Sequence, residues 1–317
     1  MVGMCFLATT AWSLADSTVE GEVSNQITNS TFDKTNDITG DYNKASIASI
    51  NLKDTHVGTS GKVNNFVDNL GDATNQINTG DYNTASIASI NTDHDTHING
   101  TVANEVNNVG QVANHITNGD FNKASIASID MEGSTVDGTV TNDVDNVGPV
   151  GNFVTGAFNS ASIASIDMVD STVGGTVTND VDNVGLVGNF VTGAFNRASI
   201  ASIDMDGSTV DGTVTNDVDN LALVSNNITG DGNRAAIASI DMEDSTVSGT
   251  LTNTTPEAIG SGNQVNGNDN MALLGSVHIA NTDISGNVNN FRDDLNNMHN
   301  IVNGDGNAVA IGSISLE

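Results

Sequence analysis

Aspartates recur along this chain at a nearly constant interval, and they are the residues best placed to do chemistry. One set is Asp130, Asp167, Asp204 and Asp241, and a second is Asp143, Asp180 and Asp217. Two carboxylates about 5 Å apart repel by roughly 1 kcal/mol even in bulk water. If the intervals stack the aspartates, we therefore expect them to be solvated, protonated or bridged by cations.

The first aspartate set is the candidate cation site. Ca²⁺ bridging Asp130, Asp167, Asp204 and Asp241 is one hypothesis, although the sequence has no established metal motif. A column of basic residues could relieve part of the repulsion: Lys44, Lys123, Arg197 and Arg234. Assembly that is faster at mildly acidic pH or with Ca²⁺ would follow from bridging or protonation. The alternative is a solvated charged face that keeps the chain soluble.

Other residue types that support catalysis do not form a recognisable set. His94 and His97 resemble a metal-ligand pair, but they fall in a variable turn, where an exposed polar role is expected. The remaining histidines are scattered: His56, His115, His278 and His299. The sequence has no recurring Ser/His/Asp or Cys/His arrangement, phosphate loop or haem motif. We predict a protein that is not an enzyme and that uses no cofactor.

Composition excludes several partners. Eight Lys and Arg against 39 Asp and Glu give a net charge of −31, which argues against nucleic acid and anionic membrane. One cysteine, Cys5, excludes a disulfide framework. No apolar run is long enough for a membrane-spanning helix.

The interval between the aspartates belongs to a repeat that covers most of the chain. A line of the type G-x-x-N-x-A-S-I-A-S-I begins at glycines that we expect in turns: Gly40, Gly80, Gly119, Gly156, Gly193, Gly230, Gly267 and Gly304. A fixed period in this range marks an architecture in which each unit buries apolar surface against its neighbours. Residues 40–303 hold seven complete repeats, starting at 40, 80, 119, 156, 193, 230 and 267.

Each repeat reads as strands and tight turns. In the second segment Val136, Val140 and Val144 share one side with Asn142, whereas the other side is polar and faces solvent. In Ala45–Ile50 neither side is charged, which predicts one strand buried on both faces; a helix is the weaker alternative. The predicted fold is all-β, a β-solenoid or stacked β-arcade with one ~37-residue repeat per layer and about eight layers.

Three asparagine sets and one serine set keep their identity in all eight copies. The first asparagine set follows the turn glycine: Asn43, Asn83, Asn122, Asn159, Asn196, Asn233, Asn270 and Asn307. The second closes G-x-[V/L]-x-N: Asn25, Asn65, Asn104, Asn142, Asn179, Asn216, Asn253 and Asn290. The third precedes the next glycine: Asn36, Asn75, Asn114, Asn152, Asn189, Asn226, Asn263 and Asn300. The serine set is Ser49, Ser89, Ser128, Ser165, Ser202, Ser239, Ser276 and Ser313.

Stacking explains these invariant positions. Layers about 4.7–4.8 Å apart place like residues above like, so that each amide donates to one layer and accepts from the other. The competing explanation, that asparagine only serves left-handed turn positions, suits one of the three sets. We predict three asparagine ladders and one serine ladder.

The two ends of the sequence suggest self-assembly. Residues 1–15 are apolar and end in small residues, which predicts a signal peptide cut before Asp16; the alternative is a divergent piece of the first repeat. Partial repeats 16–39 and 304–317 add up to one further layer. We therefore expect the half-layers of successive copies to complete each other in an open head-to-tail filament.

The repeat resembles that of secreted bacterial functional amyloids. The segment Asn226–Ala235, N-x-[I/V]-[T/N]-G-x-x-N-x-A, is similar to curli repeats in its G-x-x-N-x-A core and to Fap fibril subunits in its longer unit. The resemblance covers nearly all of 16–317. It implies an extracellular biofilm-matrix or adhesive fibre whose partner is itself, helped by secretion or nucleation machinery. Glutamine is scarcer than in those families, and the C-terminal Cys-x-x-Cys is missing.

Two alternative functions remain. A Thr-x-Thr pattern recurs in four copies and could form the flat face of an ice-binding protein: Thr139/Thr141, Thr176/Thr178, Thr213/Thr215 and Thr250/Thr252. A monomeric adhesin stalk is the other. Thermal hysteresis would identify the first, and a soluble β-protein that does not polymerise would identify the second.

Overall fold

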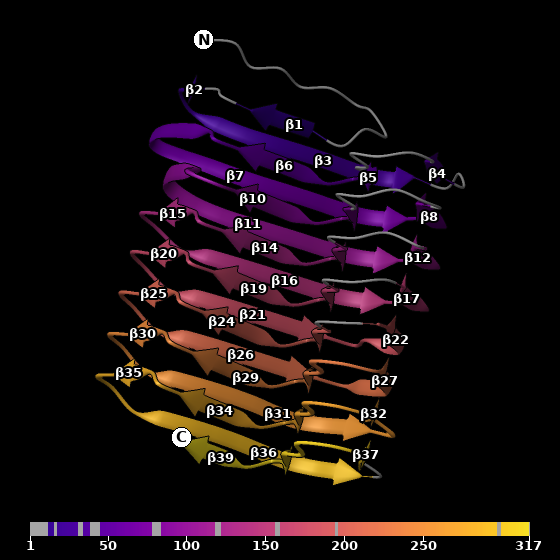
Figure 1. Cartoon of the computed structure of the whole chain (residues 1–317). Helices are drawn as coiled ribbons and strands as arrows, with labels where there is room; N and C mark the ends of the chain where they lie inside the picture. The colour runs from indigo at the N-terminus through magenta and orange to yellow at the C-terminus, as the bar shows by residue number, and fades with distance from the viewer. Residues whose placement is uncertain are drawn as a thin grey trace.

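In a computed structural model of the chain, the described residues are 12–15, 18–30, 34–38, 45–77, 84–117, 122–155, 159–193, 196–296 and 299–316. These residues form 39 strands and no helix. Neighbouring strands pair in parallel, one layer on the next, in a single stack (Figure 1). The predicted β-solenoid with a repeat of ~37 residues is confirmed, and the stack makes about seven turns.

One turn shows how a repeat is used. In the turn that begins near Asn159, the chain forms β18 (Ala161–Ile163), β19 (Ile166–Val169), β20 (Thr172–Val173), β21 (Val177–Asp182) and β22 (Gly185–Thr192). Each pairs with the strand 37 residues further along, β23 to β27. Because the pairing repeats by translation, equivalent residues of successive turns lie in a line along the stack. Such a line, with one residue per turn, is called a file here.

The strands fall into three parallel sheets. The nine-stranded sheet, called sheet A here, contains β1 (Trp12–Ala15), β6 (Ile50–Lys53), β10 (Ile90–Asp93), β14 (Ile129–Glu132), β19, β24 (Ile203–Asp206), β29 (Ile240–Glu243), β34 (Val277–Ala280) and β39 (Ile314–Leu316). The eight-stranded sheet C contains β5 (Ala45–Ile47), β9 (Ala85–Ile87), β13 (Ala124–Ile126), β18, β23 (Ala198–Ile200), β28 (Ala235–Ile237), β33 (Ala272–Leu274) and β38 (Val309–Ile311).

The 22-stranded sheet B forms the remainder of each turn. Its short strands are β2 (Thr18–Val19), β15 (Thr135–Val136), β20, β25 (Thr209–Val210), β30 (Thr246–Val247) and β35 (Asp283–Ile284). Its long strands are β3 (Glu22–Ser30), β7 (His56–Leu70), β11 (His97–Val109), β16 (Val140–Val147), β21, β26 (Val214–Asp219), β31 (Leu251–Ile259) and β36 (Val288–Asn296). Its last strands are β4 (Lys34–Ile38), β8 (Ala73–Ile77), β12 (Val112–Ile116), β17 (Val150–Thr155), β22, β27 (Leu221–Thr229), β32 (Gly262–Asn266) and β37 (His299–Asn303).

The Ala-Ser-Ile-Ala-Ser-Ile segment is buried on both faces, as predicted, but it bends and forms two short strands instead of the single strand expected. Ala201 adopts a left-handed conformation (φ 51°) between β23 and β24, and the same position is left-handed in every described turn. Ile200 and Ile203 therefore enter different core clusters, both fully buried. A left-handed alanine costs about 1–2 kcal/mol, and burial of the isoleucines, at about 1.5–3 kcal/mol each, offsets it.

The second segment agrees with the sequence prediction. Val136, Val140, Asn142 and Val144 are buried on one side, and Asp143 is exposed on the other. Gly138 lies where the chain bends between β15 and β16, and a Cβ there would overlap the backbone carbonyl of Gly100 one layer before. Close approach of backbones between layers therefore explains this glycine position.

Strand β1 bears on the predicted signal peptide. Trp12–Ala15 pairs in parallel with Ile50–Lys53 of β6, as the first strand of sheet A. This is the position that the divergent-repeat alternative assigns to it, and residues 1–11 lie outside the described ranges. Cleavage before Asp16 would remove β1 and open the edge of β6.

Candidate functional site

The second and third asparagine sets form continuous buried ladders. Each side-chain amide donates to the amide oxygen one layer further along the chain, as in Asn179 to Asn216 and Asn216 to Asn253, both at 2.9 Å. The remaining N–H binds the backbone: Asn216 donates to the carbonyl of the left-handed Ala201 at 3.2 Å. This ladder thus also supplies a hydrogen-bond donor to the backbone carbonyl at the bend between sheets C and A, which is called the corner here.

The first asparagine set closes the turn that follows the glycine, and it runs in the opposite direction. Asn233 donates to Asn196 Oδ1 of the preceding layer at 2.7 Å and also to the carbonyl of Gly230. Asn43 and Asn83 lie outside the described residues, as do Gly40, Gly80, Gly119 and Gly156. The other four turn glycines, Gly193, Gly230, Gly267 and Gly304, have positive φ angles between 80° and 111°.

The serine set lines the corner. Ser202 Oγ donates to the carbonyl of Ile200 at 2.9 Å, and its oxygen accepts the backbone N–H of Ser239 at 3.2 Å. Serine is therefore linked from layer to layer through the backbone, not from hydroxyl to hydroxyl.

The first aspartate set forms a second kind of buried file. Asp130, Asp167, Asp204 and Asp241 lie on consecutive strands of sheet A in register, and at most 4% of each residue is exposed. A solvated face is therefore wrong for this set. It applies to Asp143, Asp180 and Asp217, which are exposed on sheet B.

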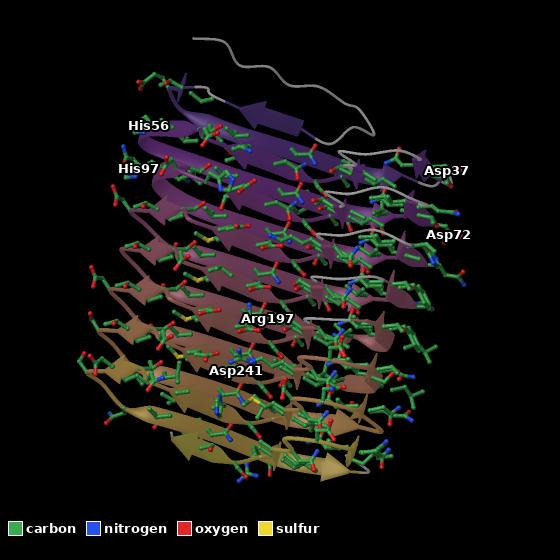
Figure 2. The ribbon with its side chains drawn as sticks, viewed as in Figure 1. Asp37, His56, Asp72, His97, Arg197 and Asp241 are labelled. Atoms are coloured by element: carbon green, nitrogen blue, oxygen red, sulfur yellow. The ribbon has the colours of Figure 1, made fainter. Side chains whose placement is uncertain are left out.

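Basic residues just before the strands of sheet C neutralise much of the buried file. Lys123 Nζ lies 2.7 Å from Asp130 Oδ1, and Arg197 holds Asp204 through Nε (2.7 Å) and Nη2 (2.9 Å). Arg234 binds Asp241 through two nitrogens in the same way. Arg197 and Asp241 are labelled in Figure 2. The predicted relief by the basic column is present, and Lys44 lies outside the described residues.

His278 is a site residue that sequence reasoning missed. It occupies the aspartate position in the next layer, and its Nδ1 lies 2.9 Å from Asp241 Oδ1. His278 follows Asp241 by one repeat of 37 residues, and this spacing could have assigned it to the same file. It was overlooked because the residue type changes from aspartate to histidine.

Burial sets the protonation of the aspartates. Burial raises the pKa of Asp130 to about 6 against the opposing charge of Lys123, and it raises the pKa of Asp204 to about 7 against Arg197. At Asp241 the effect of burial is outweighed by hydrogen bonds from His278 and Arg234, so its pKa is lowered. The buried file therefore combines charged and readily protonated carboxyls.

A cavity of about 610 Å³ opens along this file. Its lining includes the three basic residues and Asp130 and Asp167. At the rim, Glu132 is exposed and Asp206 and Glu243 are half-buried. The arrangement can bind small charged molecules, whereas nothing in it forms a nucleophile with an adjacent base.

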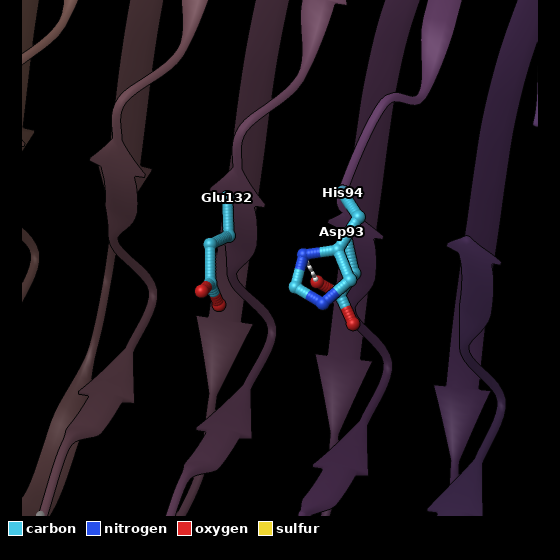
Figure 3. A group of neighbouring side chains, drawn as sticks. All are labelled: Asp93, His94 and Glu132. Atoms are coloured by element: carbon cyan, nitrogen blue, oxygen red, sulfur yellow. Dashed lines mark ion pairs between the residues drawn. The ribbon is translucent and has the colours of Figure 1, made fainter. Parts of the chain in front are cut away.

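The two histidines that resemble a ligand pair have different partners, and only His94 lies in a bend, because His97 begins β11. His94 Nδ1 lies 2.9 Å from Asp93 Oδ1, and these two residues form a group with Glu132 whose ligand atoms lie within 4.8 Å (Figure 3). His97 instead stacks on His56, with ring centroids 5.3 Å apart. The His94 group is largely exposed, so it remains a surface turn.

An apolar groove runs along another face of the stack. The rings of His115, Phe153 and Phe190 stack in successive layers at 4.6 and 4.9 Å, opposite the exposed Leu186 and Leu223. The volume of the groove is about 540 Å³. Its lining also includes the polar residues Asp72 and Gln111.

The fold and the site define the chain as a parallel β-solenoid with asparagine ladders. Comparison with protein-family models, with curated proteins and with solved structures finds no match. Within the described ranges, no helix has the length and apolar character needed to cross a membrane.

Proposed function

We propose that this protein is the structural subunit of a self-assembling, cross-β fibre in which successive copies stack end to end. In this role it acts outside the cell as matrix or adhesive material, and it catalyses no reaction. The proposal draws on the resemblance to functional amyloid repeats and on exposed apolar side chains in β38 and β39.

The observation that carries the proposal is the open edge formed by β36 to β39. Val309, Ile311 and Ile314 are 54%, 40% and 46% exposed. Their partners in the preceding layer, Ala272, Leu274 and Val277, are fully buried. Covering the three exposed side chains would contribute about 1 kcal/mol each, and unpaired parallel strands beside them are a template for further pairing.

A second copy of the chain fits this edge because the repeat is translational. Asn25 donates to Asn65 Oδ1 at 2.8 Å, as every later member of the ladder does to its successor. In a stacked pair of copies, Asn290 of one copy would donate to Asn25 of the next. Removal of residues 1–15 would favour such stacking by opening β6.

The test introduces charge at the edge. Val309→Lys with Ile311→Lys should leave the monomer folded, because both side chains are already exposed, and should prevent assembly by burying two ammonium groups. Leu186→Lys with Leu223→Lys is the matched control on a lateral surface. Sedimentation and negative-stain microscopy should reveal filaments for the wild type and the control only.

Three results would contradict the proposal. The wild type could remain monomeric at high concentration, which would favour an adhesin stalk. The edge variant could assemble as readily as the wild type. The lateral variant alone could fail to assemble, which would assign association to the apolar groove.

A further inference from the structure

The layer that contains Asp167 differs from its neighbours at the cation position. Ala124, Ala161 and Ala198 pair in register, so the residues before them, Lys123, Ser160 and Arg197, belong to one file. Ser160 carries no charge. The Asp167 layer therefore supplies a buried carboxylate without a cation of its own.

Asp167 is correspondingly under-satisfied. Its side chain is 5% exposed and lines the cavity, and its Oδ1 makes no hydrogen bond within the described part of the chain. The guanidinium of Arg197 approaches this oxygen only to 3.6 Å, because its nearer nitrogens bind Asp204. A buried acceptor without a donor costs about 1–3 kcal/mol, more for a charged group.

We propose that the cavity is a binding site for a primary ammonium group, which donates to the Asp167 carboxylate where Asp167 and Ser160 line the cavity. The preceding layer provides the template, since the ammonium of Lys123 lies 2.7 Å from Asp130. At the rim of the Asp167 layer, Val169 replaces the acidic Glu132 and Asp206 of the neighbouring layers. The ligand class is therefore a small alkylamine with a short apolar body.

The cavity fits such a ligand better than it fits a divalent ion. Its volume of about 610 Å³ is in the range of small-molecule sites. Ca²⁺ requires six to eight oxygen ligands, whereas the file places the fixed cations Lys123 and Arg197 on either side of Asp167. A singly charged ammonium makes one short, charge-assisted hydrogen bond and tolerates those neighbours.

Charge balance in the file supports a single additional cation. The four buried aspartates face the three fixed cations Lys123, Arg197 and Arg234. His278 contacts Asp241, two layers away from Asp167, and does not replace the missing charge there. An ammonium at Asp167 would complete the balance in the layer where the deficit lies.

Calorimetric titration of the folded chain with n-butylammonium chloride at pH 7.5 tests the site. Wild-type protein should bind one equivalent saturably, and n-butanol, the neutral analogue, should not bind. Asp167→Asn removes the carboxylate, and asparagine is already accepted in this file at Asn91. Ser160→Lys fills the space with a cation, as Lys123 does one layer before. Both variants should weaken binding about tenfold or more.

Asp180→Asn is the matched control, because it removes the same charge from an exposed strand and should leave binding unchanged. Equal binding by the wild type and Asp167→Asn would overturn the proposal. Loss of binding in Asp180→Asn to the same degree would also overturn it, since general attraction to an acidic protein would then suffice. Saturable binding of Ca²⁺ without binding of the amine would assign the site to a metal instead.

Discussion

Two buried files in this solenoid have the same stacking geometry and opposite electrostatic needs. An asparagine amide has a donor and an acceptor, so Asn179, Asn216 and Asn253 satisfy each other by repetition alone. A carboxylate only accepts, so Asp204 depends on Arg197, which lies just before β23 of sheet C. Asparagine files can therefore extend without limit, whereas each buried aspartate requires its own cation or proton.

Placing an aspartate in an asparagine ladder should have the largest effect on stability among the substitutions considered. Asn216→Asp places an unpaired carboxylate inside the ladder, where Asn253 loses a donor and Ala201 loses its side-chain partner. We expect the free energy of unfolding at pH 7 to fall by about 3–5 kcal/mol, measured by urea denaturation followed by circular dichroism. Asp217→Asn, at the exposed neighbouring position, should change it little. A mild effect of Asn216→Asp would show that the ladder does not depend on its donors.

Removing a cation from the aspartate file should cost somewhat less, because Asp204 can take up a proton. Arg197→Met leaves Asp204 and Asp167 uncompensated and should lower the free energy of unfolding at pH 7.5 by about 3 kcal/mol. Met271 shows that the file accepts methionine in a layer without an acidic partner. Adding Asp204→Asn should restore most of the stability. A double variant as unstable as the single one would contradict the proposed pairing.

The pH dependence of stability should distinguish the two files next. The folded-state pKa of Asp130, about 6, and that of Asp204, about 7, lie above the ordinary value of 3.8. Their stabilising protonation is complete below pH 3.8 and is lost as the pH rises through 6 to 7. The lowered pKa of Asp241 contributes stability that is complete above pH 3.8 and is lost only as the pH falls further, so it adds no slope between pH 4.5 and pH 7.5.

We therefore expect the free energy of unfolding to fall by a few kcal/mol between pH 4.5 and pH 7.5, with Asp204 contributing more than Asp130. Urea titrations at both values measure this difference. Asp204→Asn should reduce it, whereas an unchanged slope would assign the pH dependence to other groups.

Substitution of an exposed aspartate is expected to have the smallest effect on stability. Burial, followed by the charges of Asp182, Asp143 and Asp217, raises the pKa of Asp180 to about 6. Asp180→Asn relieves this repulsion, and solvent screening limits the gain in stability to about 0.5 kcal/mol at low salt. The gain should vanish in concentrated salt. A gain as large as the loss in Arg197→Met would mean that exposed and buried acidic files are equivalent.

The sequence period predicted the features that follow from residue type, such as the asparagine ladders. It did not predict features that depend on backbone conformation, such as the bend at Ala201. The asparagine positions were accessible because an amide in every repeat has a direct consequence for stacking. The corner at Ala201 was missed because alanine gives no sign of a left-handed conformation; Gly275 and Gly312, at the same position in later turns, were the available signal. That corner turns sheet A away from sheet C, so the burial of Asp204 could not be read from a straight strand.

Cryo-electron microscopy of assembled wild-type protein tests the central claim most directly. The account predicts filaments in which β36 to β39 of one copy pair in register with the first layer of the next, so that the asparagine ladders continue across the junction. Single particles with both ends free, or copies joined sideways through the groove between Phe190 and Leu186, would contradict it.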